Sequence, residues 1–90
     1  MKTIQELRSL LIATFPDQKI YLFGSRARGS ASEYSDYDIA IESDTPIRSK
    51  LSHVKTLIED STIPYKIDLI DLSKAPYLAQ TVREEGIVWH

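Results

Sequence analysis

The chain has 90 residues, enough for one hydrophobic core, so we expect a single domain over residues 1–90. Its formal net charge of −2 argues against a protein that coats nucleic acid, because binding phosphates without sequence preference needs a basic surface. The sequence holds no cysteine, which excludes disulfides, zinc–thiolate sites and thiol catalysis. No apolar run approaches the roughly 20 residues that span a bilayer. The N-terminus lacks the apolar core of a signal peptide, so we expect a cytoplasmic location.

The first part of the chain predicts a helix followed by a buried strand. Apolar residues recur at helical spacing over residues 3–15, which indicates an amphipathic helix. Thr3 and Glu6 have the spacing of a capping box at the start of this helix, and Pro16 marks its end. Residues 20–23 are apolar and β-prone, and they predict a short strand covered on both faces.

A glycine turn is expected directly after this strand. Gly24 and Ser25 stop the strand, and residues 25–28 are expected to form one helical turn that Gly29 closes. Residues 30–35 then predict a polar loop.

A second strand is expected over residues 36–42, where polar and apolar side chains alternate. The alternation puts Asp36, Asp38, Ala40 and Glu42 on one face and apolar or aromatic residues on the other. Because it carries the acids, we expect the first face to remain open.

The next elements are a helix and a third strand. The helix is expected over residues 47–60, with Asp44 or Thr45 as its N-terminal cap. The strand is expected over residues 65–72.

The C-terminal part predicts a shorter helix over residues 75–85 that ends at Gly86. Residues 87–89 form either a short terminal strand or a tail packed on the core. The order of these elements predicts a mixed α/β (α+β) domain, with a mixed β-sheet and helices mainly on one face.

Two carboxylates spaced i,i+2 begin the second strand. Asp36 and Asp38 point the same way and lie roughly 6–7 Å apart along a strand, so they can converge on a hard cation. Magnesium takes oxygen ligands and usually combines one or two carboxylates with substrate phosphates. Taken alone, such a pair is more often a polar strand end or a turn.

The turn ten residues upstream suits an anion. Gly24 allows close approach of a backbone, and Ser25 offers its hydroxyl and N–H at the start of a helical turn. Arg26 and Arg28 add charged donors that can reach phosphates. Taken alone, this piece is a strand-ending turn with two solvated arginines.

A third acid lies inside an apolar run. Asp68 is costly to bury without a partner, and it can face the same site as the first two acids if the second and third strands are neighbours. Asp71 has the opposite parity and is expected to be a solvated strand-end acid. The alternative for Asp68 is an edge-strand acid that faces water.

Together these features resemble the minimal nucleotidyltransferases of the DNA polymerase β superfamily. The family motif is Gly-Ser, about ten residues, then Asp-x-Asp, with a third acid on a later strand. Here the motif is Gly24-Ser25, then Asp36-Tyr37-Asp38, then Asp68, and the closing segment 85–89 also looks like the usual end of this domain. The resemblance covers nearly the whole chain.

The resemblance implies a reaction in which an acceptor hydroxyl attacks the α-phosphorus of ATP and pyrophosphate leaves. Two magnesium ions would lie between the acids, and the nucleotide phosphates would lie across the glycine turn. It implies catalytic and metal-binding roles for three aspartates and nucleotide-binding roles for the turn and its arginines: Asp36, Asp38 and Asp68; Gly24, Ser25, Arg26 and Arg28.

The resemblance also implies a partner. Small proteins similar to this one pair with an all-helical protein of the HEPN type, often a toxic ribonuclease, and act as antitoxins. We therefore expect a protein adenylyltransferase that modifies a tyrosine of such a partner in a type VII-like toxin–antitoxin pair, within a hetero-oligomer. Nucleic acid and membrane are not expected as partners.

Two other functions are compatible with the same residues. One is a non-catalytic antitoxin or complex subunit that acts by binding alone. The other is a small-molecule nucleotidyltransferase subunit whose helical partner forms the substrate pocket.

Overall fold

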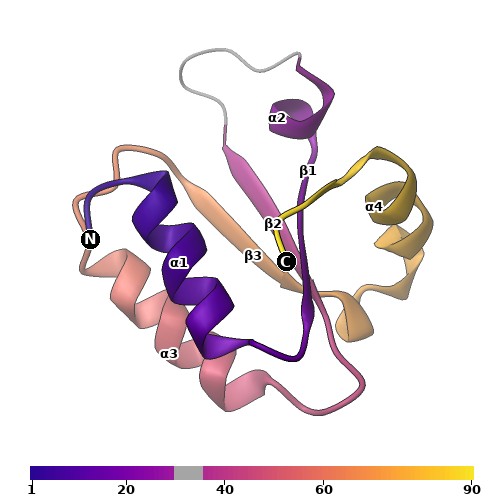
Figure 1. Cartoon of the computed structure of the whole chain (residues 1–90), viewed down its shortest axis with the longest axis horizontal. Helices are drawn as coiled ribbons and strands as arrows, with labels where there is room; N and C mark the ends of the chain where they lie inside the picture. Colours follow the sequence, from indigo (N-terminus) through magenta and orange to yellow (C-terminus); the bar gives the residue numbers. More distant parts are fainter. Residues whose placement is uncertain (30–35) are drawn as a thin grey trace.

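A four-stranded mixed sheet forms the centre of the molecule (Figure 1). The computed structural model describes residues 1–29 and 36–90, and the loop predicted over residues 30–35 lies outside the described residues. The strands lie in the order β3-β2-β1-β4, in which β2 and β3 run parallel and β1 runs antiparallel to both of its neighbours. Their bounds are Lys19–Phe23 (β1), Tyr37–Glu42 (β2), Ile67–Asp71 (β3) and Ile87–Val88 (β4).

The two long helices cover one face of this sheet, and shorter elements cover part of the other (Figure 1). The mixed α/β architecture with helices mainly on one face is therefore confirmed. The helical elements are α1 (Ile4–Thr14), α2 (Ser25–Arg28), α3 (Arg48–Glu59) and α4 (Ala79–Glu85), with two 3-10 turns, η1 (Leu72–Lys74) and η2 (Pro76–Leu78), before α4.

The larger core lies between the sheet and the helices α1 and α3. Leu7 and Leu11 of α1 and Val54 of α3 are fully buried there against alternate residues of the strands, such as Ile39 and Ile41. Burial of each such side chain contributes about 1.5–3 kcal/mol relative to leaving it exposed. This core packs against β2 on the face opposite to Asp38 and so fixes the position of the strand.

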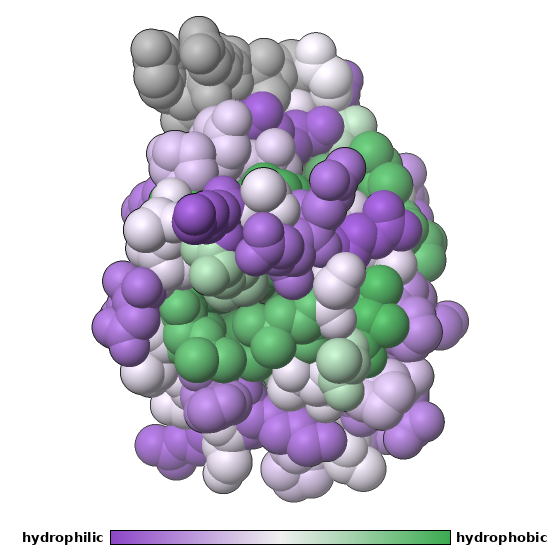
Figure 2. Space-filling model, turned by 60° about the vertical axis from the view of Figure 1, so that its left-hand side comes forward, coloured by the Kyte–Doolittle hydropathy of each residue, from purple (hydrophilic) through white to green (hydrophobic). Residues whose placement is uncertain are grey.

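Apolar side chains also reach the surface on the side of α1 and α3. Met1, Leu10 and Ile58 are only partly buried against the core, and Leu57 is exposed. Figure 2 shows a continuous apolar band across this side of the molecule, bordered by polar residues. The band belongs to the helix layer and lies on the opposite face of the sheet from the acids.

A smaller core closes part of the other face. Val82 of α4 and Leu72 of η1 pack with Ala40, Tyr21 and Phe23. The expectation that this whole face stays open is therefore wrong. Ala40 is fully buried, and only the end of the face that carries the acids is uncovered by α4.

The two predicted helix caps have different outcomes. The Thr3 hydroxyl accepts a hydrogen bond from the Glu6 N–H at 3.1 Å, so the predicted cap of α1 is confirmed. The predicted cap of α3 is wrong. Ile47 occupies the N-cap position, while the side chain of Ser43 bonds to the backbone of Thr45.

The C-terminal elements differ from the prediction in detail. The last helix begins at Ala79, because Pro76 starts a separate 3-10 turn before it. Asp71 is half-buried and accepts hydrogen bonds from the N–H and hydroxyl of Ser73, so it caps η1 and is not simply solvated. Residues 87–88 form the terminal strand β4.

None of the described helices has both the length and the apolar composition that crossing a membrane requires.

Candidate active site

Two carboxylates face each other across adjacent parallel strands. Asp38 of β2 is the register partner of Asp68 of β3, and partners in register project from the same face of a sheet. Phe23, the last residue of β1, lies on the other side of Asp38 in the same register. Asp36 directly precedes β2 and shares the parity of Asp38. The structure thus brings together the three acids that the sequence singles out.

The glycine turn lies directly against Asp38. Gly24 has φ 75° and ψ −156°, and a Cβ atom at this position would collide with the carboxylate of Asp38. The Gly24 carbonyl accepts hydrogen bonds from the N–H groups of Ala27 and Arg28, which start α2 at Ser25. Only a residue without a side chain allows the turn to approach the acid this closely.

The surroundings of Asp38 disfavour its charged form. Burial raises the pKa of the Asp38 carboxyl above its usual value, and the neighbouring charges of Asp68 and Asp36 raise this pKa further. Lys66 and Arg28 act in the opposite direction. Burial and the two neighbouring acids thus both act against the ionised form of Asp38, which a bound positive ion would favour.

The two arginines of α2 have different surroundings. The Arg28 guanidinium lies 3.4 Å from the Glu85 carboxylate of α4, and both side chains are exposed. The Arg26 guanidinium lies over the ring of Tyr37, 4.3 Å from its centroid, and 5.0 Å from the ring centroid of Tyr65. Arg28 is thus the arginine whose charge acts on Asp38, while Arg26 stacks on two aromatic rings.

Lys66 also belongs to the site, although the sequence motifs did not identify it. It precedes β3 by one residue and shares the parity of Asp68, so it belongs to the face that carries the acids. Its carbonyl accepts a hydrogen bond from the Tyr37 N–H at 3.0 Å, which brings it beside the start of β2. The same parity rule that selected Asp68 could have selected Lys66.

The sequence matches the model of a known protein family. The sequence model described as polymerase beta, nucleotidyltransferase matches residues 5–89, which is nearly the whole chain and includes all three acids. The chain belongs to the polymerase β nucleotidyltransferase family. The resemblance inferred from the Gly-Ser and Asp-x-Asp motifs is thereby confirmed.

Curated relatives within this family carry names of protein adenylyltransferases. The chain is 36% identical over 69 residues to a Haemophilus influenzae protein named "Probable protein adenylyltransferase MntA", covering 72% of this chain and 58% of that protein. It is 33% identical over 98 residues to MJ1379 of Methanocaldococcus jannaschii, also named as a protein adenylyltransferase, with 97% of this chain and 98% of that protein covered. The chain thus spans little more than half of the first relative and nearly all of the second.

Solved structures of toxin–antitoxin pairs share the nucleotidyltransferase fold. One, described as a toxin–antitoxin with AMP-PNP, has a TM-score of 0.64 and 30% identity, with 92% of this chain and 72% of that chain covered. Another is a variant of a pair called MntA–HpeT, with two aspartates replaced by glutamates. It has a TM-score of 0.66 and 27% identity, with 96% of this chain and 70% of that chain covered.

The family implies magnesium, and the donor chemistry of the site fits this ion. Among residues 1–29 and 36–90, no three His, Cys, Asp or Glu side chains already form a metal-binding group. Asp38 and Asp68 nevertheless supply two hard oxygen donors in register, where burial and the neighbouring acids raise the pKa of Asp38. Magnesium usually takes only one or two carboxylates and completes its shell with water and substrate phosphates.

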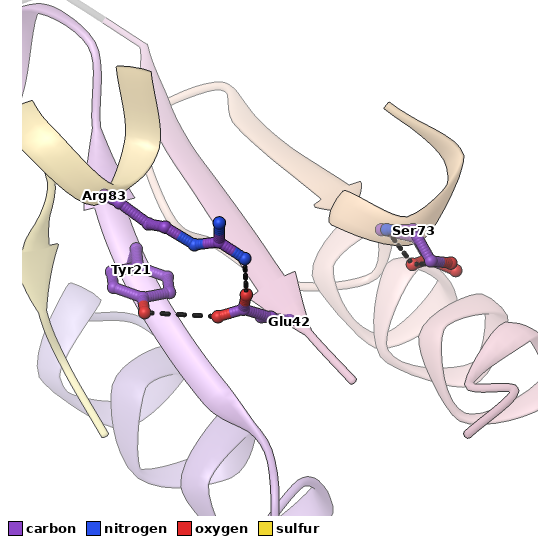
Figure 3. Close-up of polar contacts among 5 residues, drawn as sticks. Tyr21, Glu42, Ser73 and Arg83 are labelled. Atoms are coloured by element: carbon purple, nitrogen blue, oxygen red, sulfur yellow. Dashed lines mark hydrogen bonds and ion pairs between the residues drawn. The ribbon is translucent and has the colours of Figure 1, made fainter. Parts of the chain in front are cut away.

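A second polar cluster lies on the same face of the sheet as the acids, near the other end of β2. The Tyr21 hydroxyl donates to the Glu42 carboxylate at 3.3 Å, and Arg83 of α4 donates to the same carboxylate (Figure 3). The Arg83 hydrogen bond holds the pKa of Glu42 below its usual value. Burial, followed by the charge of Glu42, raises the pKa of Tyr21. This cluster fastens α4 to the strands β1 and β2.

Replacing Arg83 with glutamine is expected to lower stability at neutral pH without changing the site of the acids. The lowered pKa of Glu42 contributes stability above the usual carboxyl pKa, and this contribution disappears as the pH falls through the lowered value. The difference in melting temperature between Arg83→Gln and the natural protein should therefore shrink as the pH falls through this range. Thermal melts followed by circular dichroism measure it. A difference that stays constant down to strongly acidic pH would contradict the assignment.

Proposed function

We propose that this chain transfers AMP from ATP to a hydroxyl group of a partner protein, with magnesium as the required ion. The observation that carries the proposal is the register pair Asp38 and Asp68, set directly against the Gly24 turn. In-line nucleotidyl transfer needs carboxylates that can hold metal ions beside a backbone turn that can bind phosphates, and both lie together here.

The residues of the site have different roles in this proposal. The turn at Gly24 and the N–H groups that begin α2 at Ser25 suit the β- and γ-phosphates, and Arg28 supplies a nearby positive charge. Asp36 and Asp38 would hold the magnesium ions, which offset phosphate charge and make the acceptor hydroxyl more acidic. Arg26 can assist from its place over the rings of Tyr37 and Tyr65.

Asp68 faces the acceptor side of the reaction in this proposal, because β3 is the outer strand of the sheet. The acceptor oxygen forms a bond to the α-phosphorus while its proton passes to the carboxylate of Asp68 or to water. The bond from the α-phosphorus to the bridging oxygen breaks, and pyrophosphate leaves with the electron pair.

The acceptor we propose is a tyrosine of an all-helical, HEPN-type toxin, so that the chain acts as an antitoxin within a hetero-oligomer. Two features support a protein acceptor: the names of the relatives and the toxin–antitoxin pairs among structures of the same fold. The described residues also leave the end of the face with the acids uncovered, so a partner has room to complete the site. A cytoplasmic location is part of this proposal.

Intact mass spectrometry tests the proposal. The chain is purified from its native host together with the protein that copurifies with it, and the sample is incubated with ATP and MgCl₂. A mass gain of one AMP on the partner is the expected result, and an Asp36→Asn/Asp38→Asn double variant should abolish it.

The other outcomes identify the two alternative functions. Pyrophosphate release without any mass gain on protein would indicate a small-molecule acceptor. A double variant that still neutralises the toxin in cells as well as the natural chain would show that binding alone is the function.

A further inference from the structure

The outer edge of β3 is available for another strand. β3 is the last strand on its side of the sheet, and no described residue pairs with it there. The Tyr37 N–H donates to the Lys66 carbonyl, so even-numbered residues of the parallel strand β3 bond to β2. The N–H and C=O groups of Ile67, Leu69 and Asp71 consequently point to the outer edge, because parallel strands alternate in this way.

A groove follows this edge between β3 and α3. A depression of about 550 Å³ has Leu51, Leu69 and Ala75 among its apolar lining, and a smaller one of about 230 Å³ continues past Ile67 and Ile58. The groove gives the side chains of an added strand an apolar contact on the α3 side of the sheet. Unpaired strand edges of this kind bind extended segments by β-augmentation.

The groove favours an acidic segment. Arg48, Lys55 and Lys74 line the larger depression. The carboxylate of Asp71, which also lines it, accepts two hydrogen bonds from Ser73. Glu59 and Asp68 line the smaller depression together with Lys55. The cations therefore outnumber the acids only in the larger depression, which is the part of the groove that favours acidic side chains.

We propose that the acceptor is presented on an extended segment of the partner that pairs with the outer edge of β3. On an antiparallel segment, the residue opposite Asp68 occupies a non-hydrogen-bonded position, where Cβ atoms lie about 4.5–5.5 Å apart. Its side chain then lies on the face of the acids, and a hydroxyl there is delivered beside the Asp68 carboxylate. The residues on either side of it point toward α3, where acidic side chains meet Lys55 and Arg48. This inference rests on the proposed function and adds how the acceptor docks.

Two synthetic peptides of equal composition test the register. In ETVYETV the glutamates share the α3 side of the added strand when the tyrosine faces Asp68, and in VETYTEV they share the face of Asp68. We expect ETVYETV to bind at least about tenfold more tightly and to slow amide hydrogen exchange at Ile67 and Leu69, as measured by NMR. Equal affinity of the two peptides, or binding without this protection, would overturn the proposal.

Charge reversal at the groove provides the second measurement. Lys55→Glu is expected to weaken ETVYETV binding about fivefold, whereas Lys50→Glu, on an exposed part of α3 outside the groove, should leave it unchanged. Equal effects of both variants would show only general electrostatic attraction and refute the groove.

Transfer to the peptide separates this inference from the proposed function. Binding with protected amides but no AMP on the tyrosine, in the presence of ATP and MgCl₂, supports edge docking and counts against AMP transfer. AMP transfer to the copurified partner protein while Ile67 and Leu69 stay unprotected refutes edge docking and leaves the transfer reaction standing.

Discussion

Replacing Asp38 with asparagine is expected to reduce AMP transfer by at least about 100-fold while raising thermal stability at neutral pH. The loss of activity follows from removing the carboxylate that lies between the Gly24 turn and Asp68. The gain in stability follows because burial and the charges of Asp68 and Asp36 disfavour the ionised form of Asp38. An active site that holds such repulsion exchanges stability for function.

The pH dependence of this gain has a definite sign. Because the folded-state pKa of Asp38 is raised, the folded protein binds more protons than the unfolded chain between the ordinary and the raised pKa. Stability of the natural protein therefore falls as pH rises through this window. The difference in melting temperature between Asp38→Asn and the natural protein should be largest above the window and vanish below it. Calorimetry without added metal or nucleotide, over a series of pH values, measures it.

The control for this prediction is Asp17→Asn, which changes an exposed acid in the loop after α1. It should leave activity unchanged and alter the free energy of unfolding by no more than about 0.5 kcal/mol. If Asp38→Asn proved less stable than the natural protein at neutral pH, the carboxylate would be a net stabilising group, and its surroundings would not favour a bound cation.

Replacing Gly24 with alanine is expected to destabilise the fold and abolish activity together. The φ of 75° with ψ −156° is a conformation that is essentially restricted to glycine and costs about 1–3 kcal/mol for other residues. The new methyl group would also collide with the carboxylate of Asp38, so either the turn or the acid must move. Chemical denaturation gives the stability change, and the AMP-transfer assay gives the loss of activity.

Gly29→Ala is the matched control, because it separates backbone strain from the effect on the site. Gly29 also has a positive φ, 73°, but apart from its chain neighbours no atom of the described residues lies within 4 Å of a Cβ added there. Its left-handed conformation costs about 1–2 kcal/mol for an alanine. We expect Gly29→Ala to lose stability yet keep most of its activity. Equal losses of activity in both variants would show that the close approach of Gly24 to Asp38 has no special role.

The edge-docking proposal adds a structural reason for the outer position of β3. Under the proposed function, β3 would have one neighbouring strand for the metal site and one free side for an acceptor. The sheet would then continue from the Gly24 turn through Asp38 and Asp68 to the partner's segment. The apolar band over α1 and α3 lies on the helix side of the sheet, and Ile58 belongs both to this side and to the groove beside β3.

The local features of this protein were predictable from short stretches of sequence. The cap at Thr3, the glycine turn at Gly24 and the left-handed Gly29 each depend on residues within one or two turns of chain. The N-terminal end of α3 was not predictable in this way, because the side chain of Ser43 bonds to the backbone of Thr45, one of the two residues that were expected to cap the helix. The extra turn at Pro76 moved the start of the last helix in the same way.

The sequence by itself determined the family, the main helices and strands in their order, and the candidate acids of the site, since the motif spacing and the two-residue period of a strand are properties of neighbouring residues. Only the tertiary structure decided that β3 lies beside β2 with Asp68 in register with Asp38. The same is true of Lys66, whose charge acts on Asp38, and of the hydrogen bond from Arg83 to Glu42 at the other end of β2. These contacts join segments about 30 to 40 residues apart, and strand pairing between such segments depends on packing of the whole domain rather than on local preference.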